Sequence, residues 1–249
     1  MFDYILLFVI SFIANAFSAF AGGGAGLLQL PALIFLGLPF SVALATHKLA
    51  SVALGIGASL RHYREGSLNW RFSAVILVSG LPGVVLGATT IQFVPDRVAQ
   101  VSLGVLTTGL GIYSRMQPEL GQKMEFRHRS QQGYIIGGTL LFFIGVLNGS
   151  LTSGTGLFVT IWLVQWFGLD YKRAVAYTLI LVGLFWNGTG ALTLGLQGSI
   201  RWDWLPVLFV ASILGGYVGA HYSILKGNRW IKHVYEVVTI LVGIKLIIG

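Results

Sequence analysis

The 249-residue sequence contains no cysteine, which excludes disulfide bonds, thiol catalysis and thiolate metal sites. Charged side chains are also scarce: they make up 10% of the chain, whereas apolar residues make up 55% and the mean hydropathy is +0.80. A soluble domain needs more charge than this to cover its surface. Because continuous apolar runs of about 20 residues, the length that spans a bilayer, recur along the chain, the composition predicts an all-α polytopic membrane protein.

Carboxylates are missing from the middle of the predicted spans. The acidic residues fall in loops or at helix ends (Glu65, Asp96, Glu119, Glu125, Asp170 and Asp203) or near a terminus or span end (Asp3 and Glu236). A proton relay or sodium site inside the membrane therefore lacks its usual ligand. The sequence also has no P-loop, HExxH motif or metal-ligand cluster. We expect no catalytic, metal or cofactor site, and neither an ATP-driven pump nor an intramembrane hydrolase.

The chain does contain an internal repeat: GAGL at 24–27 matches GTGL at 154–157, GSLNW at 66–70 matches GSIRW at 198–202, and GVVLGA at 83–88 matches GGYVGA at 215–220. We therefore divide it into a first repeat (1–114), a basic cytoplasmic linker (115–132) and a second repeat (133–249). Each repeat predicts an apolar run broken by glycines, followed by three plain helices. The predicted segments are 4–21, 24–37, 42–60, 72–94 and 98–114 in the first repeat, and 133–147, 155–168, 174–196, 204–225 and 233–249 in the second.

The basic residues indicate how the repeats are oriented. If each broken run crossed the membrane once, Lys and Arg would divide almost evenly between the two sides. If each run returns to its own side, one side carries Arg61, Arg64, Arg71, Arg115, Lys123, Arg127, Arg129, Lys172, Arg173, Lys226, Arg229 and Lys232, against Arg97 and Arg201 opposite, with Lys48 and Lys245 inside spans. The positive-inside rule favours this second arrangement, with both termini outside. The predicted fold is therefore two inverted-topology repeats, each a broken or re-entrant helical hairpin plus three transmembrane helices.

Two glycine-rich segments, AGGGAG (21–26) and NGSLTSGTG (148–156), interrupt the apolar runs, and each precedes a short helix. Irregular backbone persists in a membrane only where protein buries it or where it lines a cavity. A helix N-terminus offers N–H groups and about half a positive charge, and glycines let an anion approach closely. We interpret the two breaks as one shared anion site. For Gly83, Gly87, Gly215 and Gly219 we favour the alternative, that glycines only allow close helix packing.

A single basic residue, Lys48, lies well inside an early span, on a face of small residues. Its charge suits an anionic substrate, although snorkelling to the outer helix end explains it equally well. His47 either binds substrate, carries a proton or is a packed, satisfied imidazole. In the second repeat Leu179 takes the place of Lys48, and Tyr177 and Thr178 supply hydroxyls. The predicted substrate-binding residues are Gly22, Gly23, Gly24, Gln29, Thr46, His47, Lys48, Ser51, Asn148, Ser150, Thr152, Ser153, Thr155, Tyr177, Thr178 and Asn187.

Several of these stretches resemble a known family. GGGAGLLQLPALIFLGLP (22–39) with ALATHKLAS (43–51), GASLRHYREGSLNW (57–70) and GVLNGSLTSGTGLF (145–158) are similar to motifs of the sulfite exporter TauE/SafE family of bacterial membrane transporters. The resemblance implies transport of small sulfur-containing anions such as sulfite or organosulfonates, usually outward, across the bacterial inner membrane. The chain departs from the family at Ala45 and His47, where Gly and Asn are more usual, at Ser153, where Pro is common, and at Leu179, where many members carry a second lysine.

We expect alternating access, in which the anion sits between the broken hairpins and the halves rock around it. Because the cell interior is electrically negative, a leaving anion gains about 2.3 kcal/mol per charge per 100 mV, so membrane potential is the expected driving force. Two alternatives stay open: proton-coupled uptake of sulfate- or thiosulfate-like anions through His47 or a loop acid, and a membrane scaffold that transports nothing. The expected partners are the small anion and the lipid bilayer. Nucleic acid is excluded because the net charge of +8 reflects topology, and a homo-oligomer stays open.

Overall fold

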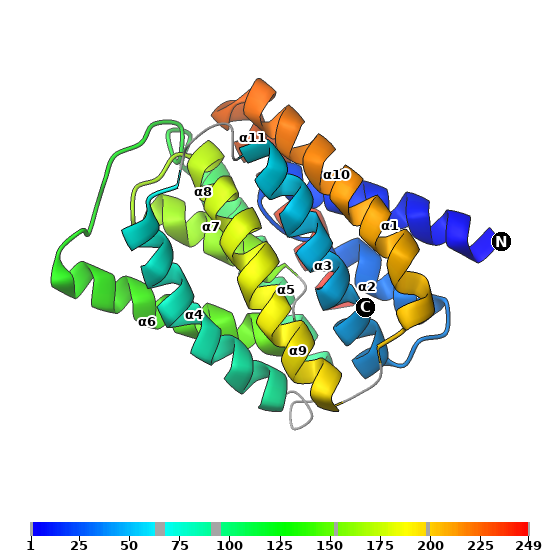
Figure 1. Ribbon diagram of the computed structural model, residues 1–249. Coiled ribbons are helices and arrows are strands. Elements are labelled where there is room, and N and C mark those ends of the chain that lie inside the picture. Colours follow the sequence, from blue (N-terminus) through cyan, green and yellow to red (C-terminus); the bar gives the residue numbers. More distant parts are fainter. Residues whose placement is uncertain (1, 63–67, 91–95, 152–153, 198–199, 249) are drawn as a thin grey trace.

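The computed structural model describes residues 2–62, 68–90, 96–151, 154–197 and 200–248, which form helices with no strand among them (Figure 1). Within those ranges, six helical segments are long and apolar enough to cross a membrane: Tyr4–Ala21, Val42–His62, Trp70–Thr90, Gln131–Ser150, Tyr171–Leu196 and Trp202–Lys226. The predicted all-α polytopic membrane fold is therefore confirmed.

The helices follow the predicted order in both halves of the chain. The first half contains α1 (Phe2–Ala21), α2 (Gly26–Phe35), α3 (Phe40–His62), α4 (Trp70–Thr90) and α5 (Asp96–Met116). The second contains α6 (Gln131–Ser150), α7 (Thr155–Gln165), α8 (Tyr171–Tyr177), the π-helix η3 (Thr178–Trp186), α9 (Asn187–Gln197), the 3₁₀ turn η4 (Trp202–Trp204), α10 (Leu205–Lys226) and α11 (Asn228–Ile248). Most helix ends lie within four residues of the predicted ones, and two differences are larger. The segment expected at 174–196 is interrupted by π-helical winding, and the last helix begins at residue 228 rather than 233.

The first break follows from three consecutive glycines with left-handed backbone. Gly22, Gly23 and Gly24 have φ angles of +88°, +147° and +101°, which residues with a Cβ rarely adopt. In the second break Gly154, with φ +78°, directly precedes α7. The helices that follow, α2 with 10 residues and α7 with 11, are about 15 Å long, half the thickness of a hydrocarbon core. Each break is thus followed by a short helix, as predicted.

Helices from the two halves are interleaved. Helix α1 packs along α10 and α6 packs along α4, while α5 contacts α11 and α3 contacts η3. Figure 1 shows α3 beside the α8–α9 segment in the centre, with α10 and α1 on one side and α4 and α6 on the other. If each helix is replaced by its counterpart in the other half, the α1–α10 pairing becomes the α6–α4 pairing, and the α5–α11 and α3–η3 pairings are unchanged. Two related repeats produce this pattern. The inversion of the repeats across a membrane stays a prediction.

Glycines bring the two outer helix pairs into close contact. A Cβ on Gly83 or Gly87 of α4 would collide with the backbone of α6, and a Cβ on Gly215 or Gly219 of α10 would collide with the backbone of α1. Gly83 and Gly87 in the segment GVVLGA occupy the same positions as Gly215 and Gly219 in the repeated segment GGYVGA. Small residues let helices approach closely where lipid provides no hydrophobic driving force. The interpretation of these four glycines as packing residues is therefore confirmed.

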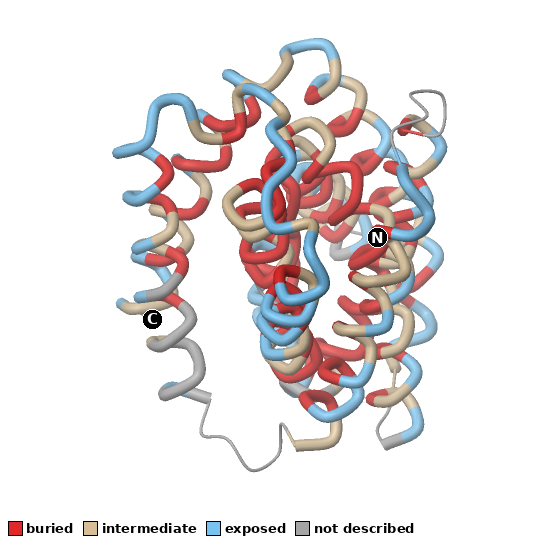
Figure 2. Tube along the Cα trace, turned by 90° about the vertical axis from the view of Figure 1, so that its left-hand side faces the viewer, coloured by how far each residue is buried: buried red, intermediate tan, exposed pale blue. Residues whose placement is uncertain are grey.

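The outer surface of the bundle is apolar. Phe17 of α1, Val78 of α4, Phe143 of α6 and Leu214 of α10 are exposed. Figure 2 shows buried residues along the inner sides of the helices and exposed residues along the outer sides. Since exposed aliphatic and aromatic side chains are stable against acyl chains but not in water, this surface fits a bilayer.

The linker between the halves is fixed to the second half. The backbone N–H groups of Glu125 and Arg127 donate to the carbonyl oxygens of Gly168 and Phe167, at 2.8 and 3.2 Å. The loop between α7 and α8 therefore pairs with the linker as two short extended segments would. Arg129 of the linker lies over the Phe72 ring near the start of α4, at 4.2 Å from its centroid.

Candidate functional site

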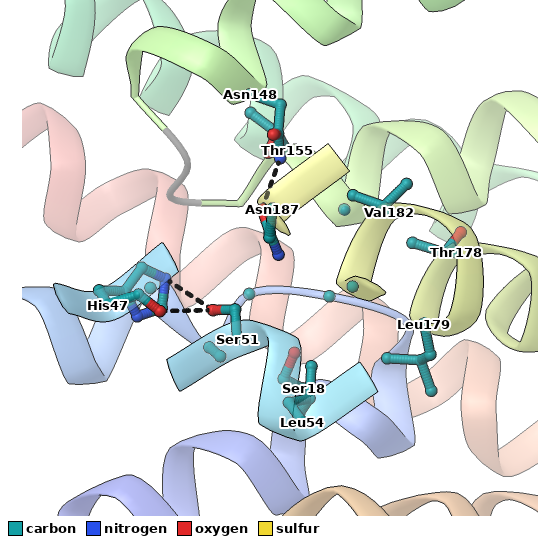
Figure 3. Close-up of a pocket in the computed structure, with 16 residues that line it drawn as sticks. Ser18, His47, Ser51, Leu54, Asn148, Thr155, Thr178, Leu179, Val182 and Asn187 are labelled. Atoms are coloured by element: carbon teal, nitrogen blue, oxygen red, sulfur yellow. Dashed lines mark hydrogen bonds between the residues drawn. The ribbon is translucent and has the colours of Figure 1, made fainter. Parts of the chain in front are cut away.

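The two glycine-rich breaks meet at one small cavity of about 40 Å³, which is room for about three water-sized atoms. Described residues from both halves line it: Ser18, Gly23, Gly24, Ala25, Gly26, His47, Ser51, Leu54, Asn148, Thr155, Gly156, Thr178, Leu179, Val182, Gly183 and Asn187. Figure 3 shows Asn187 between Thr155 on one side and Ser51 on the other. We call this space the central cavity.

The breaks touch each other directly through their backbones. A Cβ on Gly23 would lie 2.6 Å from the carbonyl carbon of Gly156 and 2.6 Å from the backbone nitrogen of Leu157, so only glycine fits at residue 23. The start of α2 (Gly26) and the start of α7 (Thr155) therefore face the same space. Each helix N-terminus carries partial positive charge, and the two contributions add in the central cavity.

His47 is oriented by a chain of buried hydrogen bonds. Gln29 Nε2 donates to Ser11 Oγ at 3.0 Å, and Gln29 Oε1 lies 2.7 Å from His47 Nδ1. With this amide orientation Nδ1 carries a proton and donates it, which leaves Nε2 of a neutral imidazole as an acceptor. Ser51 Oγ lies 3.3 Å from that Nε2, and both residues line the central cavity. Gln29 thus acts behind the wall as the residue that positions His47.

Lys48 is fully buried and bonds to the end of α6. Its ammonium donates to the Asn148 carbonyl oxygen at 2.7 Å and lies 3.4 Å from Asn148 Oδ1. Asn148 belongs to the last turn of α6, where its carbonyl oxygen also accepts from the Leu151 N–H and the helix dipole is negative. Gly190 leaves space for the side chain, since a Cβ there would lie 3.0 Å from Lys48 Nζ. The ammonium points into the protein, so the snorkelling alternative is wrong.

Asn148 connects this ammonium to the central cavity. Its Nδ2 donates to Thr155 Oγ1 at 2.9 Å and lies 3.4 Å from Asn187 Oδ1. Asn148, Thr155 and Asn187 all line the cavity, whereas Lys48 is absent from its described lining. The Lys48 ammonium therefore lies directly behind the cavity wall, and the Asn148 side-chain amide separates it from the cavity.

The structure brings together about half of the predicted substrate-binding residues. Those that line the central cavity are Gly23, Gly24, His47, Ser51, Asn148, Thr155, Thr178 and Asn187. The others are absent from its described lining (Gly22, Gln29, Thr46, Lys48 and Ser150) or line a different cavity (Tyr177). The Gly22 carbonyl oxygen, for example, accepts from Thr160 Oγ1 at 2.8 Å. Thr152 and Ser153 lie outside the described residues.

Sequence reasoning missed the π-helical part of the wall. Helix η3 places Thr178, Leu179, Val182 and Gly183 on the cavity, and it contacts α3 at Gly55, where a Cβ would lie 2.9 Å from the Gly183 carbonyl carbon. The stretch TLILVGLFW is continuously apolar and has no proline, so nothing in it signals a departure from α-helix. π-helical segments occur often at functional sites, and here the segment forms one side of the cavity.

A buried ion pair in α11 corrects the expectation that Glu236 lies near a span end. Because α11 begins at residue 228, Glu236 lies inside the helix, buried and paired with Lys232. Ser114 of α5 accepts from Lys232 Nζ through its carbonyl oxygen at 2.5 Å, and its hydroxyl lies 3.2 Å from Glu236 Oε1 and 2.9 Å from Tyr171 Oη. Lys232, expected in a loop, is buried as well. The cluster joins α5, α8 and α11 and is absent from the described lining of the central cavity.

The walls of the central cavity suit a small anion. Its described lining supplies hydroxyls, amides, an imidazole and the backbone of two helix starts, without a carboxylate. No group of three or more metal-ligating side chains occurs in the part of the chain that the structure describes. Hydrogen-bond donors combined with positive potential bind an anion without any chemical step.

Comparison with known proteins gives one consistent picture. The family model described as sulfite exporter TauE/SafE matches residues 7–246. A probable membrane transporter protein of Haemophilus influenzae is 30% identical over 97% of this chain and 93% of its own length. The probable membrane transporter protein ORF9 of Sinorhizobium sp is 30% identical over 97% and 91%, and the probable membrane transporter protein YfcA of Escherichia coli K12 is 28% identical over 97% and 88%.

Proposed function

The chain belongs to the sulfite exporter TauE/SafE family of membrane transporters, and on this premise we propose that it exports small sulfur-containing anions, such as sulfite or organosulfonates, by alternating access. The single observation that carries the proposal is the convergence of both breaks on the central cavity, where Gly23 of one half contacts Gly156 of the other. We place the protein in the bacterial inner membrane with both termini outside, because the basic loop residues then face the cytoplasm.

The donors around the central cavity match an oxyanion. Two helix starts contribute partial positive charge, the side chains of Thr178 and Asn187 supply hydrogen-bond donors, and Lys48 adds one positive charge through Asn148. A volume of about 40 Å³ fits an anion of a few heavy atoms once the site opens slightly. Binding between elements of both halves lets either side of the site open in turn.

Export needs no coupling ion in this scheme. The described lining of the central cavity holds no carboxylate that would carry a proton or bind sodium. The membrane potential itself favours exit by about 2.3 kcal/mol per charge per 100 mV, which corresponds to about a 50-fold change in the equilibrium distribution of a monovalent anion.

Voltage dependence tests this proposal. We expect efflux of radiolabelled sulfite from proteoliposomes to speed up when a potassium gradient with valinomycin makes the interior negative, and to slow down when the gradient is reversed. The control is the same vesicles with equal potassium on both sides. An efflux rate that is independent of the imposed voltage would contradict anion movement without a coupling ion.

His47 supports a second candidate function, proton-coupled anion uptake. Its Nε2 faces Ser51 and the central cavity while Gln29 holds Nδ1, which is the arrangement of an imidazole that can accept a proton from the cavity. Acidifying the outside of vesicles should then accelerate sulfite entry, and His47→Asn should remove the acceleration. An entry rate independent of external pH would exclude this candidate.

Replacing Lys48 by methionine is expected to weaken sulfite binding about 10- to 100-fold. The ammonium donates to Asn148 rather than to the anion, so it stabilises the bound anion through space; for unit charges about 7 Å apart at an effective dielectric constant of about 20, this is worth about 2 kcal/mol. Methionine keeps the length of the side chain while removing the charge. The measurement is equilibrium binding of labelled sulfite to purified protein. Lys245→Met, at an exposed position of α11, is the matched control. Equal affinity of the two variants would show that the buried ammonium is only structural.

A further inference from the structure

A second and much larger cavity lies beside the start of α4. Its volume is about 600 Å³, and it extends over the linker and the start of α8. Arg71, Arg129 and Arg173 line it together with aromatic side chains such as Phe126 and Tyr177, and no Asp or Glu is among its described lining residues. We call it the arginine cavity. Its wall therefore concentrates positive charge beside apolar surface.

The arginine charges are only partly neutralised. Arg173 pairs with Asp170 at 3.1 Å, whereas Arg71 has no hydrogen-bond or ion-pair partner among the described residues. The Arg129 guanidinium lies over the Phe72 and Phe126 rings, at 4.2 and 4.6 Å from their centroids, and its Nε is buried without a partner in the described structure. Apart from Nη1, which donates to Tyr134 Oη at 3.4 Å, the N–H donors of the Arg129 guanidinium stay available for an oxyanion such as phosphate.

An apolar groove continues from the arginine cavity along the outside of the bundle. It has a volume of about 870 Å³ and lies between α4 and α6, where Val78, Ile135 and Gly138 form part of its wall. It shares Val75, Arg129 and Tyr134 with the arginine cavity. Val78 is 74% exposed and Ile135 60% exposed, so the groove opens toward the surface that faces acyl chains.

We propose that the arginine cavity and this groove together bind one anionic phospholipid. The phosphate of the headgroup sits among Arg71, Arg129 and Arg173, and an acyl chain follows the groove between α4 and α6. The positive charge of the three arginines favours an anionic headgroup. The adjoining apolar groove favours a lipid, because a small soluble anion would leave the groove empty. Basic pockets between transmembrane helices bind anionic headgroups in this way. The site is separate from the central cavity and does not depend on the transported substrate.

Native mass spectrometry of the full-length protein in detergent tests the headgroup part of the proposal. We expect dioleoyl phosphatidylglycerol to bind at least tenfold more tightly than dioleoyl phosphatidylcholine, and the double variant Arg71→Gln/Arg129→Gln to lose this preference. Arg127→Gln removes the same charge two residues from Arg129, but at an exposed side chain paired with Glu125, and should retain the preference. Equal binding of the two lipids, or equal loss in Arg127→Gln and the double variant, overturns the proposal.

A second comparison tests whether the occupant is a lipid or a free anion. Val78→Trp fills the groove and should weaken phosphatidylglycerol binding, whereas Ile136→Trp, on the same exposed surface of α6 but outside the groove lining, should not. Glycerol 3-phosphate, which has the phosphate without the chains, should fail to displace the lipid at equal concentration. Displacement by glycerol 3-phosphate would identify a soluble-anion site and overturn the lipid assignment. None of these readouts involves sulfite, so they remain interpretable if the transport proposal fails.

Discussion

Replacing Gly23 by alanine should abolish transport, whereas the same change at Gly37 should leave most of it. Both residues have positive φ, +147° and +93°, so alanine strains the backbone at either place by about 1–3 kcal/mol. Only at Gly23 would the new Cβ also meet backbone, 2.6 Å from the Gly156 carbonyl carbon, because nothing lies within 4 Å of a Cβ on Gly37. The start of α7 must then move away from the start of α2, at a further cost of about 1–3 kcal/mol.

Efflux of labelled sulfite from proteoliposomes measures the effect, and thermal unfolding in detergent measures the stability of both variants. Strain alone lowers the melting temperature of both proteins to a similar extent. Separation of the two breaks lowers transport only in Gly23→Ala. If Gly23→Ala transports as fast as Gly37→Ala, the two breaks need not touch for the protein to work.

Replacing Lys232 by methionine is expected to destabilise the protein by about 3–5 kcal/mol, because it leaves a buried carboxylate without its counter-charge. Within the described part of the structure, the Glu236 carboxylate would keep one hydrogen bond, from the Ser114 hydroxyl. Replacing both partners, as in Lys232→Met/Glu236→Leu, should recover most of the loss, since a buried ion pair is often no more stable than a well-packed apolar pair. Thermal or denaturant unfolding in detergent, followed by circular dichroism, measures the difference.

The control for this series is Lys226→Met, which removes a lysine from an exposed position at the end of α10. Surface positions of this kind usually change stability by less than about 0.5 kcal/mol. A double variant as unstable as Lys232→Met would show that the hydrogen bonds with Ser114 and Tyr171, rather than charge balance, hold α5, α8 and α11 together.

The parts of the site that could be predicted are those with a local signal. Three glycines in a row cannot continue a helix in lipid unless the protein covers them, so the break at 22–24 and its burial follow from the residues themselves. The repeated glycine pattern at 83–88 and 215–220 indicated two equivalent helix contacts in the same way. Lys48 was identified in the sequence because a lysine well inside an apolar span is unusual. Its hydrogen-bond partner, Asn148, was not identified, because the two residues are far apart in the chain and only folding brings them together.

Other features had no local signal. The π-helical winding of η3 depends on how α3 and Gly183 meet, and the apolar stretch that forms it is compatible with an ordinary α-helix. Glu236 was assigned to a span end because the hydropathy of α11 rises only after its charged first turns, whereas the backbone is helical from residue 228. The arginine cavity combines residues from α4, the linker and α8, so no single window of the sequence contains it.

The packing of α1 along α10 affects the order in which the protein is assembled during translation. Asn15, buried in α1, donates to Ser212 Oγ of α10 at 3.0 Å, and Ser212 is synthesised long after α1 has left the ribosome. The Asn15 amide also donates to the Ser11 carbonyl oxygen within α1, at 2.6 Å, so until α10 arrives one of its N–H groups lacks a partner, and an unsatisfied polar group in a bilayer costs several kcal/mol. The first helix of the nascent chain should therefore stay at the insertion machinery, or in a temporary position, until nearly the whole polypeptide has been made.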